Sequence, residues 1–406
     1  MPIYLQRGII PKKRHTILPA NPGFRQNGIY EGIHYEEVVT TAGFSRAYSI
    51  VYHLRPPTRV RKIESLTPES QGIRAEAPLR ELRHYHLKTG KIAQEGDLLS
   101  GRIPVLQNNE VIISRCRPKV QMRELFRNAS ADELIFVHRG SGTLRSMFGS
   151  LPFRPYDYIM IPRTTTYQIE FDSIDSPSDQ GQMPIDLLII EATGNIEIPK
   201  RYLNPDGQIR LGAPYCERDF HGPMQTDPID LDTETPVVIQ ANGQRSRYVL
   251  ANHPFDVVGW DGMVYPYTFN ALDFEPVTGT IHQPPPIHQT FEAQGFVVCT
   301  FAPRLLDTHP QAIKVPYAHS NVESDEMLYY VAGQFGSRRG VEEASITLHP
   351  SGIPHGPHPG TIMASREVTR TNELAVMVDT FAPLNVAKKA LELEDRNYPY
   401  SWLENE

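Results

Sequence analysis

The sequence predicts an all-β protein in which one small jelly-roll barrel is used twice. Three observations support this prediction: short apolar runs, frequent turn residues between them, and a layout that returns in the second half of the chain. The 406 residues include 36 Pro and 28 Gly, which is typical of many short strands joined by tight turns. Apolar runs of four to eight residues bounded by Gly and Pro are strand signals.

The first unit is predicted within residues 121–250. Its expected strands are the runs Glu133–Arg139, Thr143–Phe148, Tyr158–Ile161 and Tyr167–Phe171. Gly140 and Gly149 supply turns between these runs, and Pro162 ends the third, because proline cannot donate to a strand ladder.

The second unit is predicted within residues 251–406 and repeats this layout. Its expected strands are the runs Glu326–Ala332, Ala344–Leu348 and Glu373–Phe381. In both halves a Glu precedes a Gly at the same spacing, in Glu133–Gly140 and Glu326–Gly333. In both halves a Pro also opens a six-residue turn, at 162–167 and 350–355. A repeat of this kind predicts one barrel unit used twice.

The two ends of the chain have less regular patterns. Residues 1–120 are rich in Pro, with short alternating runs such as 47–54, and are predicted to form an irregular N-terminal arm with edge strands. Residues 385–395 contain good helix formers after Asn385, a residue favoured at helix N-caps, and predict one short C-terminal helix.

Composition excludes several classes of protein. The net charge is −7 with scattered basic residues, so a nucleic-acid partner is not expected. The sequence contains no apolar run long enough for a membrane span or the core of a signal peptide. A cytoplasmic protein is therefore expected. Three cysteines without CxxC spacing argue against a disulfide framework and against a thiolate metal site.

The second unit carries a candidate metal site. Its E-x6-G and P-x-G-x2-H patterns are similar to the two halves of the cupin signature, which predicts a two-cupin fold. The turn at 350–355 would bring His355 beside His319 and Glu326. Two imidazoles and one carboxylate leave coordination positions open for substrate and O2, as in non-haem Fe(II) oxygenases. The sequence therefore predicts iron(II) as the cofactor.

Alternatives exist for individual residues of this site. Glu323 is the competing carboxylate, because H-x3-E is also a common cupin spacing. Glu326 is favoured because it alone has the E-x6-G relation, which would leave Glu323 and Asp325 pointing outward. His349 is expected to support the ligands or to contact substrate, and His358 is expected to be exposed to solvent.

The first unit serves as an internal control. Tyr167 stands at the position of His355, and Phe126 at the position of His319. Glu133 remains, but a single carboxylate does not make a transition-metal site. We therefore expect the first cupin to be metal-free and structural, and the second to be catalytic.

The second half also carries a family resemblance. The runs DVVGWDGMVYPYTFNALDF, TIHQPPPIHQTF, PYAHSNVESDEMLYYVAGQF and LHPSGIPHGP resemble the homogentisate 1,2-dioxygenase family in order and spacing. Weaker similarity occurs in FSRAYSIVYHLRPP, in the first cupin and in DRNYPYSWL. The resemblance implies ring opening of homogentisate by O2 to maleylacetoacetate, a step in tyrosine and phenylalanine breakdown.

The resemblance also implies roles for individual residues. The iron ligands of the family fall on His319, Glu326 and His355, and its catalytic base falls on His282. The residues that it places around the substrate are His349, Phe335, Tyr317 and Asn321. Phe335 stands where the family has a substrate-contacting tyrosine, and the segment from His319 to Glu326 is one residue longer than the family pattern.

Other functions and partners follow from the same comparison. A related hydroquinone-type acid such as gentisate is an alternative substrate, and a non-catalytic two-cupin protein or a metal-dependent cupin isomerase is an alternative class. The expected partners are a small aromatic substrate and O2. The family assembles as trimers and hexamers, so the resemblance implies a homo-oligomer.

Overall fold

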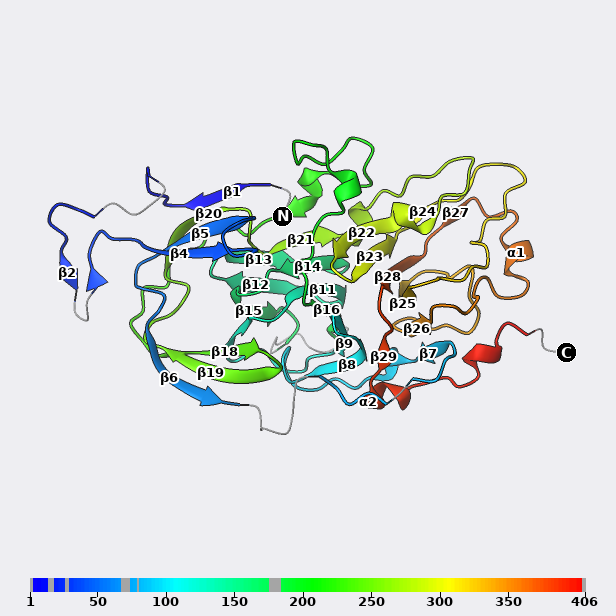
Figure 1. The fold of residues 1–406 in the computed structure, drawn as a ribbon, viewed down its shortest axis with the longest axis horizontal. Coiled ribbons are helices and arrows are strands. Elements are labelled where there is room, and N and C mark those ends of the chain that lie inside the picture. The colour runs from blue at the N-terminus through cyan, green and yellow to red at the C-terminus, as the bar shows by residue number, and fades with distance from the viewer. Residues whose placement is uncertain are drawn as a thin grey trace.

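The two predicted units fold as two adjoining β structures (Figure 1). A computed structural model of the chain describes residues 3–13, 18–25, 29–66, 74–78, 80–174 and 184–403. Nearly all of the strand pairs are antiparallel, and the parallel pairing of β10 with β18 is the exception among the described ladders. No helix in these ranges is long and apolar enough to cross a membrane.

Two sheets form the first unit. The eight-stranded sheet consists, in spatial order, of β17 (Phe220–His221), β21 (Tyr267–Asn270), β14 (Asp157–Ile161), β11 (Asp132–Arg139), β16 (Asp186–Ala192), β9 (Val111–Cys116), β8 (Arg102–Gln107) and β29 (Asn385–Val386). The seven-stranded sheet consists of β13 (Gly149–Phe153), β12 (Gly142–Ser146), β15 (Thr166–Phe171), β10 (Leu125–Asn128), β18 (Thr235–Ala241), β19 (Gln244–Leu250) and β6 (Val60–Ser65). One cluster of buried apolar side chains from both sheets fills the space between them.

In the central strand β11, residues 134–137 form an uninterrupted apolar run that packs on both faces of the sheet. Ile135 and Val137 belong to the core between the two sheets, whereas Leu134 and Phe136 belong to a second core shared with the other unit. Successive side chains of a strand point to opposite faces, so a segment that contacts an apolar core on both faces is apolar at consecutive positions.

The second unit is built on one six-stranded sheet. In spatial order it consists of β22 (Gln289–Ala293), β23 (Phe296–Phe301), β28 (Leu374–Thr380), β25 (Asp325–Ala332), β26 (Ile346–His349) and β7 (Tyr85–Leu87). This sheet packs against the first unit through the shared core, where the hydroxyls of Tyr158 and Thr300 lie 2.8 Å apart.

Smaller elements complete the chain. A four-stranded sheet has the order β1 (Leu5–Gly8), β20 (Val257–Gly262), β5 (Tyr48–His53) and β4 (Tyr35–Thr40). Two pairs consist of β2 (Phe24–Arg25) with β3 (Ile29–Tyr30), and β24 (Arg304–Leu305) with β27 (Arg370–Thr371). The α-helices are α1 (Thr361–Ala364) and α2 (Lys388–Leu391). Short 3-10 turns are η2 (Thr89–Lys91), η3 (Lys200–Tyr202), η4 (Glu217–Asp219), η5 (Ala271–Asp273), η6 (Pro285–His288) and η7 (Tyr398–Tyr400).

The predicted internal repeat is confirmed by the strand register. In the first unit Phe126 of β10 pairs with Tyr167 of β15, and in the second His319 pairs with His355 in an isolated bridge. The strands that carry the two glutamates also correspond, because β11 pairs with β14 as β25 pairs with β26. The sequence alignment of the two halves therefore matches their backbone geometry, and the all-β two-cupin prediction is confirmed.

The structure differs from expectation at both ends of the chain and at the predicted boundary between the two units. The strands β5, β8 and β9 lie inside sheets, so residues 1–120 supply more than edge strands. The strands β20 and β21, which follow the predicted boundary at 250/251, pair with β5 and β14 of the first half. At the C-terminus, Asn385 lies in β29 and is not a cap, and α2 covers only Lys388–Leu391.

Candidate metal centre

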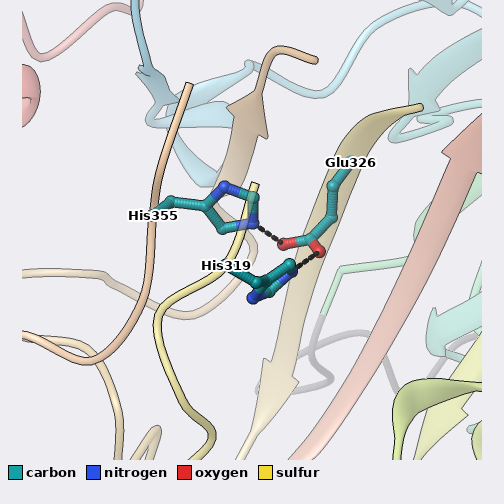
Figure 2. Close-up of side chains that lie close together, drawn as sticks. All are labelled: His319, Glu326 and His355. Carbon is teal, nitrogen blue, oxygen red and sulfur yellow. Dashed lines mark ion pairs between the residues drawn. The ribbon is translucent and has the colours of Figure 1, made fainter. Parts of the chain in front are cut away.

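Backbone pairing brings the three predicted ligands together. Glu326 is the second residue of β25, in the middle of the six-stranded sheet. The backbones of His319 and His355 pair through two hydrogen bonds, from His319 N to His355 O at 2.8 Å and from His355 N to His319 O at 2.9 Å. Figure 2 shows both imidazoles turned toward the carboxylate.

The turn at 350–355 depends on two glycines. Gly352 has φ +78°, a left-handed conformation that glycine adopts without strain, and its N–H donates to Asn321 O at 2.7 Å. A Cβ at Gly356 would lie 2.6 Å from Ala318 Cα. This close approach of the two chain segments is what allows the bridge between their neighbours, His319 and His355.

The side-chain atoms fit a single metal ion. Glu326 Oε2 lies 3.6 Å from His319 Nε2, and Glu326 Oε1 lies 3.4 Å from His355 Nε2. One potential ligand atom from each residue lies within 4.8 Å of the other two. The buried Nε2 of His355 has no hydrogen-bond partner, although buried polar atoms nearly always have one. An ion between these atoms would satisfy it.

The electrostatics favour an ionised carboxylate. Burial opposes ionisation of Glu326, but His319, His349 and His355 together hold the pKa of its carboxyl well below its ordinary value. Conversely, the interaction with Glu326 outweighs burial and raises the pKa of His319. The carboxylate of Glu326 is therefore ionised and can bind a cation.

His349 lies behind the carboxylate and outside the cavity. It is fully buried, its Nδ1 lies 2.9 Å from Glu326 Oε1, and its Nε2 lies 3.0 Å from the hydroxyl of Tyr398. Burial is the largest cause that lowers the pKa of His349 to about 3. This placement matches the expected support of a ligand, and it does not match direct substrate contact.

A cavity of about 420 Å³ opens beside the candidate centre. Its lining includes His319 and Glu326 together with the predicted residues His282, Tyr317 and Asn321. Nδ1 of His282 lies 3.0 Å from Asp307 Oδ2, and the ring centroids of His282 and Tyr317 are 5.1 Å apart. The cavity lining therefore includes the predicted base, His282, and two of the three predicted ligands, His319 and Glu326.

Several expected positions need correction. Phe335 packs on Tyr330, with ring centroids 4.7 Å apart, and it does not line this cavity. Glu323 is exposed as expected, but Asp325 is buried, pairs with Arg80 and accepts from Ser351 N at 2.9 Å. The aspartate does lie opposite Glu326 by strand alternation, where it ties the metal-site turn to the sheet.

His358 is also buried, contrary to expectation. Its Nδ1 accepts from Arg339 N at 2.7 Å, and its Nε2 lies 2.9 Å from Ser401 Oγ. Its ring lies 4.5 Å from that of Trp402. The HGPHP run gave no sign of this, because Arg339 and the C-terminal residues Ser401 and Trp402 lie far from it in the sequence.

Four cavity residues were not anticipated in their roles. They are Arg304, Asp307, Lys314 and the buried His288. Burial and the nearby charge of Arg304 lower the pKa of His288 to about 3, and its ring centroid lies 4.6 Å from that of Phe301. All four lie in or next to irregular segments, where no periodic pattern predicts the direction of a side chain.

The first unit holds a guanidinium where the second has its candidate ligands. Arg102 is ion-paired with Glu133, and Tyr167 donates to the same carboxylate at 2.7 Å. The Arg102 guanidinium also lies 5.5 Å from the ring centroid of Phe126. The positions that match His319, Glu326 and His355 are thus joined around a fixed side-chain cation.

Comparison with known proteins places the chain in a family. The family model for the N-terminal part of homogentisate 1,2-dioxygenase matches residues 49–271, more than half of the chain. A protein of Saccharolobus solfataricus, provisionally named a dioxygenase, is 39% identical over 99% of both chains. The chain belongs to the homogentisate 1,2-dioxygenase family. The predicted resemblance is confirmed.

Other members and structures are more distant. The homogentisate 1,2-dioxygenase of Bradyrhizobium diazoefficiens is 25% identical, over 70% of this chain and 64% of its own length. Among solved structures, a cupin 2 conserved barrel protein from Leptotrichia buccalis covers 73% of this chain and 95% of its own, with 8% identity and a TM-score of 0.34. The candidate centre lies beyond the range of the family model but within the span of the Saccharolobus relative.

Proposed function

We propose that this protein is an iron(II)-dependent dioxygenase that opens the ring of homogentisate to give maleylacetoacetate. The observation that carries the proposal is the cluster of His319, Glu326 and His355 at a cavity that also contains His282. Membership of the homogentisate 1,2-dioxygenase family supports the substrate and the reaction.

Three side chains would hold the metal. Two neutral imidazoles and one carboxylate, His319, His355 and Glu326, match the donor set of non-haem Fe(II) oxygenases. Iron(II) held there would offer open coordination positions to the substrate and O2 and would allow electron transfer between them. The hydrogen bond between His349 and Oε1 of Glu326 would hold the carboxylate in a fixed orientation toward the metal.

His282 is suited to remove the phenol proton. Its Nδ1 interacts with the carboxylate of Asp307, which fixes the neutral tautomer that has its proton on Nδ1. Nε2 then has a free lone pair and can accept a proton from a ring hydroxyl in the cavity. Tyr317 packs its ring against this imidazole and restricts its orientation.

The aromatic ring would lie in the cavity between these groups. Phe301, Pro316 and Tyr317 supply apolar surface, while the metal ligands and His282 provide the reacting edge. Packing of the substrate ring on this apolar surface would displace water and hold the ring near the reacting groups. Its encounter with O2 would then be effectively intramolecular.

The test is O2 uptake by anaerobically iron(II)-loaded protein on addition of homogentisate, with absorbance of the opened product followed in parallel. Uptake equal to product formed, lost in His355→Ala and kept in the exposed control His221→Ala, is the expected result. If the iron-loaded protein consumes O2 with gentisate but not with homogentisate, the proposed reaction type holds and gentisate is the substrate. Absence of uptake with every dihydroxylated aromatic acid would overturn the function.

A further inference from the structure

Two basic side chains line the cavity together with the candidate metal centre: Arg304 and Lys314. The acidic groups that share this lining are Asp307, Glu326 and Asp379. Asp307 is engaged by His282, and Glu326 is engaged by the three histidines. Within the described residues, none of these carboxylates forms an ion pair with Arg304 or Lys314.

Arg304 is a largely buried cation whose ion pair with a carboxylate is long. Its side chain is 16% exposed, and its recorded carboxylate neighbour among the described residues is Glu373, at 4.0 Å. Hydrogen-bonded arginine–carboxylate pairs have N–O distances of about 2.7–2.9 Å. Burial lowers the pKa of Arg304 and raises the pKa of Glu373, so both shifts indicate incomplete pairing. An arginine nevertheless stays protonated in proteins.

The guanidinium is held in place by neutral groups. Nη1 donates to Ala302 O at 3.1 Å, and the guanidinium carbon lies 5.6 Å from the ring centroid of Phe301. Lys314 is held in a similar way, because its Nζ donates to the carbonyls of Asp307 and His309. These contacts orient both cations without neutralising their charge, so two positively charged groups lie in the cavity lining.

We infer that Arg304, supported by Lys314, binds the carboxylate of the aromatic acid substrate. This inference rests on the proposed function, because the ring must be held at the metal centre for its carboxylate to reach Arg304. A guanidinium can donate two parallel hydrogen bonds to one carboxylate, which fixes the direction of the ring as well as its affinity. The subsite therefore selects aromatic acids over neutral hydroquinones.

The test compares two ligands that differ only in the carboxylate: homogentisate and methylhydroquinone. Their dissociation constants are measured by equilibrium dialysis against iron(II)-loaded protein without O2, so that no turnover occurs. Arg304→Met should weaken homogentisate binding by about 10- to 100-fold and leave methylhydroquinone within about twofold. Arg304→Lys keeps the charge, so its homogentisate affinity should lie between those of the unaltered protein and Arg304→Met. Lys314→Met should weaken homogentisate binding less than Arg304→Met does.

The control is Arg366→Met, whose side chain is 75% exposed, and it should change neither constant. Equal weakening of both ligands by Arg304→Met, or no change in either, would overturn the subsite. O2 uptake of the unaltered enzyme is measured separately. If homogentisate binding depends on Arg304 but no O2 is consumed, the proposed function is wrong and the carboxylate subsite is supported. If O2 is consumed but Arg304→Met binds homogentisate normally, the subsite is wrong and the function is supported.

Discussion

His349 Nδ1 lies 2.9 Å from Glu326 Oε1, so the candidate metal ligand is fixed from behind by a buried histidine. The imidazole is fixed in turn by the hydroxyl of Tyr398, 3.0 Å from Nε2. With the Tyr398 hydroxyl donating to Nε2, the proton of the neutral ring stays on Nδ1 and is donated to the carboxylate. The C-terminal segment thereby controls the geometry of a site in the second barrel.

The first prediction concerns this chain of hydrogen bonds. Tyr398→Phe removes the hydroxyl and frees the tautomer of His349, so we expect iron(II) affinity to fall by about 10-fold or more. Competition with a chromogenic chelator measures it. Tyr400→Phe, an exposed tyrosine in the same segment, is the matched control and should bind iron normally. Equal affinities of the two variants would contradict the role of Tyr398.

The second prediction separates the base from the metal ligands. His282→Ala should lower kcat by about 10²- to 10⁴-fold with nearly unchanged iron content, because His282 lines the cavity outside the ligand cluster. Asp307→Asn should lower kcat less, and the double variant should be no slower than His282→Ala, since both residues act through one imidazole. Iron loss in His282→Ala equal to that in His355→Ala would rule out this assignment.

The sequence predicted the parts of this site that belong to the internal repeat or to the family resemblance, and it missed contacts made by other segments. The match of Tyr167 with His355 and of Phe126 with His319 holds because repeated barrels reuse one strand register, which spacing reveals. Asp307 and Arg304 escaped prediction because they follow the last long strand before the site, in a segment without period. Similarly, the burial of His358 depends on Ser401 and Trp402, contacts that no local pattern encodes.

The N-terminal residues were underestimated for a related reason. The strand β9 is central in its sheet because it pairs with β16 and β8 at once, and β7 joins the sheet of the other barrel. Such pairings link positions far apart in the chain, and the sequence of one strand does not identify its partner.

The third prediction tests the role of Arg102 in the first barrel. Arg102→Met would leave Glu133 buried beside Glu191 without its cation, so the free energy of unfolding should fall by about 3–5 kcal/mol. Denaturant unfolding measures it. Arg145→Met breaks an exposed pair with Glu170 in the same barrel and should cost less than about 1 kcal/mol. Similar losses in the two variants would show that Arg102 is not the central support of this barrel.

The fourth prediction is a dependence of stability on pH that arises at His53. This buried imidazole lies 2.7 Å from Asp256 and 3.3 Å from Glu37, with Arg55 on the far side of Asp256 and Arg127 near Glu37. Burial lowers its pKa, but the two carboxylates outweigh burial and raise the pKa to about 9 from the ordinary 6.5. The charged form is therefore favoured by folding.

The direction of the effect follows from proton linkage. Below pH 6.5 His53 is protonated in both folded and unfolded chains, so its full contribution to stability is present. As pH rises toward 9 the unfolded chain loses this proton first, and a contribution on the order of 3 kcal/mol disappears. Urea unfolding between pH 6 and 9 should show this decline in the unaltered protein and in His221→Gln, an exposed control. In His53→Gln the protein should be less stable at pH 6 and the decline should be largely absent. An unchanged slope in that variant would mean that other groups produce the dependence.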